Sequence, residues 1–261
     1  MKYFDSHAHY YDERFSSECD KGVDELIGSL FESNVSCIIN VGTSPETSRE
    51  AISQAKSHPN MYAAAGIHPS DTRFLSDPTS EIAEIRSLIL DKSNKCVALG
   101  EIGLDYHYPD TDKEKQMRYF ELQMLLAEEL SIPVVIHDRD SHEDVMTVIR
   151  RHPNVKGVLH SFSGSREMAA ELIKLGWYIS FSGTITFTNA RKPKEVAASL
   201  PHDKVLIETD APYLAPHPER GTLNHSGKLE FTNKALAEIW GITPEECAKI
   251  TEENAKRFFN L

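Results

Sequence analysis

Eight short apolar segments alternate with stretches of helical periodicity from one end of this 261-residue chain to the other. Segments such as Val134-Val135-Ile136 are apolar at consecutive positions, which is typical of strands covered on both faces. Strands that alternate with helices in this way predict an α/β fold around a parallel sheet. We expect the strands at residues 2–5, 36–41, 61–66, 96–101, 133–137, 157–160, 177–182 and 204–209.

The stretches between these segments carry helix signals. Apolar residues recur at helical spacing at residues 23–31 and again at residues 117–127, in each case as one stripe. The segment from Phe231 onward predicts two helices, and Thr243, Pro244 and Glu246 have the pattern of a capping box with proline in the first turn.

Eight strands with eight crossovers predict a (β/α)8 TIM barrel, formed by residues 1–261 as a single domain. No low-complexity linker or break in composition marks a second domain. An open doubly wound sheet would produce a similar alternation, and it is the alternative fold. A barrel, unlike an open sheet, collects its chemistry at the C-terminal ends of many strands.

Composition and charge exclude several classes of protein. No apolar segment approaches the roughly 18 residues that span a membrane, and the N-terminus carries no signal-peptide pattern, so we expect a soluble cytoplasmic protein. The four cysteines form no C-x-x-C pair, which suggests neither a zinc ribbon nor a disulfide framework. A net charge of −12 argues against broad adhesion to nucleic acid. No feature indicates an obligate protein partner.

The histidines divide according to their place relative to the predicted strands. Those at or just beyond strand ends, where barrel active sites are built, are His7, His9, His68, His137 and His160. Others precede strands or lie in helix starts and loops, where turn, capping or solvated roles are expected. These are His58, His142, His152, His202, His217 and His225.

Several of these histidines are accompanied by carboxylates at the same level of the barrel. His7 and His9 are two residues apart on an extended segment, so their imidazoles point the same way and can share one ion. Glu101 and Asp210 follow buried strands, where an uncompensated carboxylate is costly. Mixed nitrogen and oxygen donors of this kind suit two divalent metal ions. The predicted ligands are His7, His9, Glu101, His137, His160 and Asp210.

Six ordered motifs, together with the C-terminal segment ENAKRFF at residues 253–259, carry a family resemblance over nearly the whole chain. The motifs are FDSHAH at residues 4–9, GIHP at 66–69, GEIGLDY at 100–106, PVVIHDR at 133–139, HSFSG at 160–164 and ETDAPYL at 208–214. The chain resembles the TatD-type deoxyribonucleases, metal-dependent barrel hydrolases of the amidohydrolase-like superfamily.

This resemblance implies hydrolysis of phosphodiester bonds in DNA with divalent metals, often by removal of nucleotides from a 3′ end. His7, His9 and Asp210 would hold one ion and His137 and His160 the second, with Glu101 between them. We expect Asp210 to orient the attacking water and accept its proton, and Glu101 to act chiefly as a ligand within this catalytic pair. The metals could be Mg, Zn or Mn.

Three further residues are predicted to contact the phosphates of a DNA substrate, which we expect to be single-stranded or to present 3′ ends. These are His68, Arg139 and Arg220, and for each arginine the alternative is an internal ion pair. Asp105 and Tyr106 either shape the substrate cleft or pack their loop.

One loop departs from the pattern of the family. Members usually carry Arg-Gly-Lys-x-Asn-x-Pro after the last strand, whereas this chain reads RGTLNHSGK at residues 220–228. Two other functions stay open, and the variant loop supports the first of them. One is hydrolysis of a small-molecule ester or amide on the same fold, and the other is a non-enzymatic role in which metals only stabilise the barrel.

Overall fold

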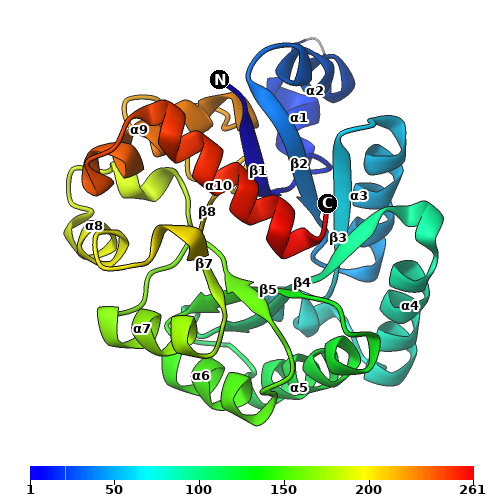
Figure 1. Cartoon of the computed structure of the whole chain (residues 1–261). Coiled ribbons are helices and arrows are strands. Elements are labelled where there is room, and N and C mark those ends of the chain that lie inside the picture. The colour runs from blue at the N-terminus through cyan, green and yellow to red at the C-terminus, as the bar shows by residue number, and fades with distance from the viewer. Residues whose placement is uncertain (21) are drawn as a thin grey trace.

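The computed structural model describes residues 1–20 and 22–261. Its eight strands form one parallel sheet in the order of the sequence, as Figure 1 shows. They are β1 (Tyr3–Ala8), β2 (Val35–Val41), β3 (Met61–Ala65), β4 (Cys96–Asp105), β5 (Val134–Arg139), β6 (Gly157–Leu159), β7 (Tyr178–Phe181) and β8 (Val205–Ile207).

The sheet closes on itself between its first and last strands. Ala8 and Ala211 form a parallel bridge, and the backbone N–H of Asp210 donates a hydrogen bond of 2.9 Å to the carbonyl of His7. The predicted (β/α)8 barrel is therefore confirmed, and the open doubly wound sheet is wrong.

Helices follow the strands and surround the barrel, as Figure 1 shows. The α-helices are α1 (Glu13–Glu18), α2 (Val23–Glu32), α3 (Pro45–Ser57), α4 (Pro78–Leu90), α5 (Lys113–Leu130), α6 (His142–Arg151), α7 (Arg166–Lys174), α8 (Arg191–Ala197), α9 (Leu229–Trp240) and α10 (Pro244–Phe259). Short 3-10 helices are η1 (Pro69–Phe74), η2 (Lys92–Asn94), η3 (Gly183–Thr186), η4 (His202–Lys204) and η5 (Ser226–Lys228). The two predicted C-terminal helices and the capping box at Thr243 are confirmed. None of the described helices is long and apolar enough to cross a membrane.

Two strands extend beyond their predicted ends. β1 continues from residue 5 to Ala8, and β4 continues from residue 101 to Asp105. The predicted strands end too early because the polar residues His7 and Glu101 interrupt the apolar pattern. Backbone hydrogen bonding between the strands continues past both residues. Polar side chains therefore lie within the strands as well as after them.

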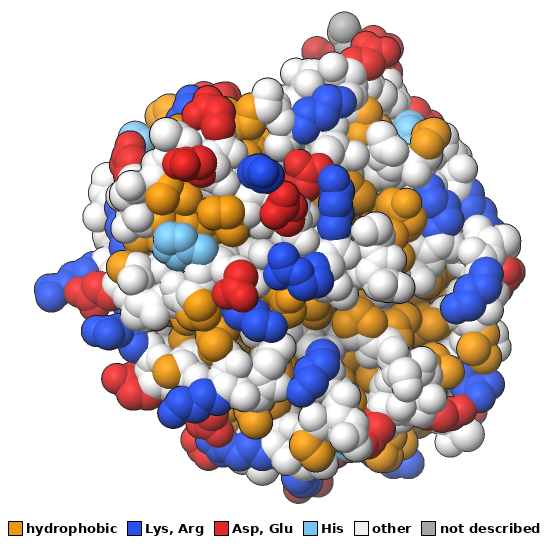
Figure 2. Space-filling model, in the orientation of Figure 1, with side chains coloured by type: hydrophobic (Ala, Val, Ile, Leu, Met, Phe, Trp, Pro, Cys, Tyr) orange, Lys and Arg blue, Asp and Glu red, His pale blue; other side chains and the backbone are white. Residues whose placement is uncertain are grey.

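One end of the barrel is closed by apolar packing. Side chains from all eight strands form a cluster inside the barrel, and Phe258 and Phe259 of α10 complete it at the N-terminal end of the strands. Figure 1 shows α10 lying across this end, and Figure 2 shows acidic and basic side chains interspersed over the same face. The polar side chains of the predicted centre lie at the opposite end of the barrel, at the C-terminal ends of the strands.

Candidate metal centre

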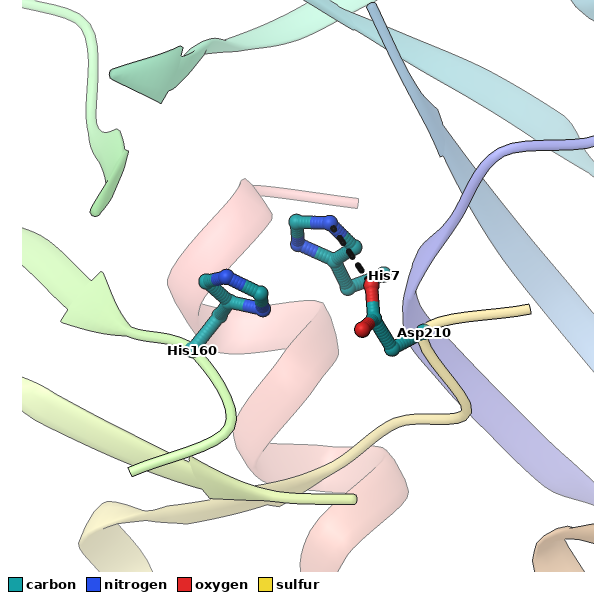
Figure 3. Close-up of side chains that lie close together, drawn as sticks. All are labelled: His7, His160 and Asp210. Carbon is teal, nitrogen blue, oxygen red and sulfur yellow. Dashed lines mark ion pairs between the residues drawn. The ribbon is translucent and has the colours of Figure 1, made fainter. Parts of the chain in front are cut away.

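The structure brings all six predicted ligand side chains together at the C-terminal ends of the strands. They come from β1, β4 and β5 and from the segments that follow β1, β6 and β8. Figure 3 shows His7, His160 and Asp210 converging from three of these segments, with the ion pair of His7 and Asp210 drawn as a dashed line.

Four of the donor atoms form one compact group. The Nε2 atom of His7 lies 3.0 Å from Nε2 of His9, 3.3 Å from Oε2 of Glu101 and 3.7 Å from Oδ1 of Asp210. The Nε2 atom of His9 lies 3.6 Å from the same Glu101 oxygen and 3.4 Å from the same Asp210 oxygen. Ligands about 2.1 Å from a tetrahedral ion are about 3.4 Å from one another. This donor set therefore fits a divalent cation.

The other carboxylate oxygen of Glu101 faces a second group. Its Oε1 atom lies 2.8 Å from Nε2 of His160 and 2.9 Å from Nδ1 of His137, and these two nitrogens are 3.4 Å apart. Glu101 thus presents one oxygen to each group of donors. This is the arrangement that a carboxylate shared by two ions requires.

Three of the histidines are oriented through the ring nitrogen that faces away from the centre. His9 donates from Nδ1 to the carbonyl of Val41 at 2.7 Å. The corresponding contacts of His160 and His137 join Nδ1 to Glu208 at 3.2 Å and Nε2 to Asp105 at 3.1 Å. Such contacts fix the tautomer and leave the lone pair of the other nitrogen for a metal.

Sequence reasoning missed Glu208 and left two roles open for Asp105. Leu206 belongs to the cluster inside the barrel, and alternation along β8 turns Glu208, two residues later, to the same side. This spacing is a signal that could have identified Glu208 from the sequence. The structure shows that Asp105 contacts His137 of the candidate centre. Tyr106 instead donates a hydrogen bond from its hydroxyl to the carboxylate of Asp144.

We expect Glu208→Gln to weaken metal binding by about 10- to 100-fold, because the amide no longer provides the charge that orients His160. Equilibrium dialysis against buffered metal solutions measures this change. Glu32→Gln, on the exposed side of α2, is the matched control. Equal metal affinity of both variants would show that Glu208 does not orient a ligand.

Two ligands owe their direction to irregular strand pairing. Phe4 of β1 and Ala98 of β4 lie in the apolar cluster inside the barrel, so strict alternation would turn His7 and Glu101 outward. The register of β1 against β2 and of β4 against β5 shifts at these positions. Irregularities of this kind re-aim side chains and are frequent beside active sites.

A glycine permits the close approach of two of these strands. Gly103 has a φ of +133°, and a Cβ atom there would lie 2.1 Å from the carbonyl oxygen of His137. A larger residue would therefore separate β4 from β5 beside the centre.

The charges of the centre stabilise one another. Burial by itself would raise the pKa of Glu101, but the imidazoles of His160, His68 and His7 outweigh it and hold the pKa well below its usual value. Burial also opposes protonation of His160, whereas Glu101 and Glu208 raise its pKa well above its usual value. Glu101 is thus an anionic ligand at neutral pH.

His68 reaches the centre as a hydrogen-bond donor. Its Nδ1 atom accepts from the backbone N–H of Ser70 at 3.1 Å, so the proton resides on Nε2, which lies 3.5 Å from Oε1 of Glu101. Burial lowers the pKa of His68 to about 3. The neutral imidazole therefore directs an N–H group toward the centre, which is unsuitable for metal ligation and suitable for an acceptor on a substrate.

A cavity of about 730 Å³ opens over the centre. His68 and Arg139 line it, whereas Arg220 lies outside this lining with its guanidinium 4.3 Å from the ring centroid of Phe187. Neither arginine has an ion pair within the described ranges, so the alternative of internal ion pairs for them is wrong. The contact of either arginine with a phosphate stays a prediction.

The loop that departs from the family pattern supports Asp210. Asn224 is buried and donates to the carbonyls of Thr209 and Tyr213 at 2.9 and 2.6 Å, which hold the turn on either side of Asp210. Lys228 contacts the hydroxyl of Thr222. The retained asparagine therefore has a structural role in shaping the metal centre.

Comparison with known proteins agrees with this fold. The sequence model of the family described as "TatD related DNase" matches residues 4–260. The uncharacterized metal-dependent hydrolase YabD of Bacillus subtilis is 40% identical over 260 residues, which cover 99% of each chain.

Solved structures give the same result. YjjV, a TatD homologue of Escherichia coli, superposes with a TM-score of 0.90 at 30% identity over 99% of this chain and 98% of its own. A phosphotriesterase homology protein of Escherichia coli, solved with phosphate in its active site, has a TM-score of 0.69 at 15% identity over 99% and 98% of the two chains, which shows the fold alone. The chain therefore belongs to the TatD family of metal-dependent hydrolases.

Proposed function

We propose that this protein is a deoxyribonuclease that hydrolyses phosphodiester bonds with two divalent cations, by removal of nucleotides from a 3′ end. The observation that carries the proposal is the position of Glu101, whose two carboxylate oxygens face two separate groups of donors. Paired cations of this kind act on both the attacking and the leaving oxygen of a phosphoryl transfer. The family's description as a DNase favours DNA as the substrate.

The side chains have distinct roles in this proposal. Two cations would be held on the two sides of Glu101, one by His7, His9 and Asp210 and the other by His137 and His160. When bound, the cations supply Lewis acidity that lowers the pKa of water and neutralises charge on the phosphoryl oxygens.

The proton and the substrate are handled by residues that line the cavity. Asp210 accepts the proton of the attacking water, and its side chain, 15% exposed, is open to the cavity. His68 donates its Nε2–H to a phosphoryl oxygen, and Arg139, at the rim, pairs with a phosphate of the strand. Arg220 would contact a phosphate further along the strand.

Removal of metal tests the proposal directly. We expect a chelator to abolish cleavage of a single-stranded DNA oligonucleotide, and we expect Mg, Mn or Zn added in excess to restore it. A gel that resolves product lengths separates stepwise loss from a 3′ end from internal cutting. Elemental analysis of the purified protein identifies the metals and their number. Cleavage that persists after metal depletion would contradict the proposal.

Asp210→Asn provides a second test of the same mechanism. The amide is similar in size but accepts no proton, so we expect DNA cleavage to fall by about 100-fold or more even at saturating metal. His137→Ala, which removes a donor of the second group, should lose activity that excess metal restores in part. Full activity of Asp210→Asn would show that another group accepts the proton.

A second candidate function is hydrolysis of a small-molecule ester or amide, because a water activated at the same site would also attack a carbonyl carbon. The carboxylates that line the cavity favour this candidate, since they repel a polyanion in the absence of metal. Parallel assays with DNA, RNA and generic ester and amide substrates separate the two functions.

A cytoplasmic location stays a prediction, which cell fractionation would test.

A further inference from the structure

Exposed aromatic side chains lie at the end of the barrel that carries the metal centre. Among the aromatic residues in the described ranges 1–20 and 22–261, the most exposed are Phe74, Tyr108 and Tyr213, at 72%, 52% and 44%. Phe74 follows β3, Tyr108 follows β4 and Tyr213 follows β8, so all three lie at the end of the barrel that carries the centre. Exposed apolar rings confined to one end of a molecule indicate an interaction surface.

Arginine side chains accompany two of these rings. The guanidinium of Arg73 lies 4.5 Å from the ring centroid of Phe74, and that of Arg139 lies 5.8 Å from the ring centroid of Tyr108. An arginine covers one face of a ring, and the exposed fractions of Phe74 and Tyr108 show that much of each ring stays open to solvent. Each pair therefore offers a cation beside an open aromatic face.

A third pair lies further round the same end of the barrel. Arg220, on the loop after β8, stacks over Phe187, which follows η3 and β7. None of the three arginines forms an ion pair with any described residue. Three unpaired arginines on one rim are notable in a chain of net charge −12. We call this set the arginine–aromatic rim; it consists of Arg73, Phe74, Tyr108, Arg139, Phe187 and Arg220.

The rim differs in charge from the cavity that it borders. Arg139 is the one lysine or arginine among the described residues that line the cavity. The carboxylates in that lining are Asp12, Glu13, Glu50, Asp71, Glu101, Asp105 and Asp210. Attraction between phosphates and the acidic cavity wall cannot supply much affinity for a strand, so affinity has to come from the rim, of which Tyr108 and Arg139 also line the cavity.

We propose that the arginine–aromatic rim binds an unpaired nucleic-acid strand by stacking its bases on the open faces of the rings, while the arginines contact the phosphates between them. Stacking on aromatic rings accepts every base, and it requires bases that are not paired in a duplex. The rim thereby selects single strands, and the phosphodiester that enters the acidic cavity does so because neighbouring nucleotides are already held. This inference rests on the proposed nuclease function for its class of ligand.

Binding without catalysis tests the inference. The full chain in excess chelator is titrated into a short fluorescein-labelled single-stranded DNA, the same sequence as RNA, and the same sequence as a blunt duplex, and fluorescence anisotropy gives the Kd. We expect the two single strands to bind and the duplex to bind at least about 10-fold more weakly. With three arginines in contact with phosphates, the slope of log K against log salt should be about −2.

The decisive test is a variant that lacks the rings of Phe74 and Tyr108. Phe74→Ala together with Tyr108→Ala should weaken binding of the single strands by about 100-fold, because each stacked base contributes about 10-fold. Phe74→Tyr with Tyr108→Phe keeps both rings and should restore wild-type binding. Leu125→Ala removes an apolar side chain of similar exposure, 53%, from α5 and should leave binding unchanged.

The binding and hydrolysis assays distinguish a failure of the rim inference from a failure of the proposed nuclease function. Bis(p-nitrophenyl) phosphate has no neighbouring nucleotides to stack, and it should be hydrolysed at the wild-type rate by Phe74→Ala, whose ring lies outside the lining of the cavity. Loss of strand binding in the ring-free variant supports the rim even in a protein that hydrolyses no phosphodiester. Wild-type binding by the ring-free variant, or equal binding of duplex and single strand, overturns the inference even where DNA is cleaved.

Discussion

Glu101→Gln is expected to lower the rate of phosphodiester hydrolysis by at least about 1000-fold. Glutamine has the same shape, but it provides one neutral oxygen where Glu101 provides two anionic ones, each of which faces its own group of histidines. A variant of this kind should bind fewer than two metals per chain. Steady-state hydrolysis at saturating metal, together with equilibrium dialysis, measures both effects.

Measuring the stability of the Glu101→Gln variant separates a loss of catalytic activity from a loss of folded protein. Without the buried carboxylate, His160 loses one of the two anions that raise its pKa and keeps the other, Glu208, so we expect the Glu101→Gln variant to remain folded. Its thermal unfolding in chelator should be close to that of Glu32→Gln, the exposed control on α2. Near-normal hydrolysis by a folded Glu101→Gln variant would contradict the shared position of Glu101 between two ions.

Asp5→Ala should destabilise the fold by about 3 kcal/mol or more, because it leaves buried donors without an acceptor. Asp5 is fully buried and accepts from the hydroxyls of Thr209 and Ser226 at 2.6 Å, and from the backbone N–H groups of Thr209 and His7 at 3.0 and 3.3 Å. These contacts join β1 to the segment that carries Asp210. Urea denaturation in chelator measures the free energy of unfolding without a contribution from metal.

A conservative variant distinguishes the hydrogen bonds from the charge of Asp5. Burial raises the pKa of Asp5 to about 7, against the lowering effect of Ser226 and Thr209. The amide of Asp5→Asn can accept from the N–H groups and donate to the two hydroxyls, so we expect most of the stability to return. Asp110→Ala removes an exposed carboxylate and should change stability by no more than about 0.5 kcal/mol. Equal stability of Asp5→Ala and Asp110→Ala would show that the contacts of Asp5 contribute little.

Sequence reasoning located most of the strands because their apolar side chains are packed on both faces. It placed β5 and β7 to within one or two residues, whereas it ended β1 and β4 too early. In both of the shortened strands a ligand of the candidate centre lies inside the strand, and a polar residue interrupts an apolar pattern without interrupting backbone pairing. The errors in the predicted strand ends therefore fall at residues whose side chains belong to the candidate centre and not to the apolar core.

The histidines illustrate how far spacing alone can sort residues. His58 and His152 precede strands and cap the ends of α3 and α6 in the structure, as their positions predicted. His68 shares its place after a strand with the ligands, yet its hydrogen bond from Ser70 gives it the wrong tautomer for a metal. Tautomers depend on neighbours that no spacing rule identifies.

The sequence by itself determined the alternation of strands and helices, the end of the barrel that carries the chemistry, and the residue types of the centre. Alternation along regular strands also predicts that His137 and His160 face inward, since Val135 and Val158 do. Only the tertiary structure decided the direction of His7 and Glu101, because one shift of register turns a side chain to the opposite face of a strand. Such a shift arises from pairing with a neighbouring strand, and the contacts that orient His9, His137 and His160 join residues 32 to 48 positions apart. Interactions between distant parts of the chain exist only once the barrel has closed.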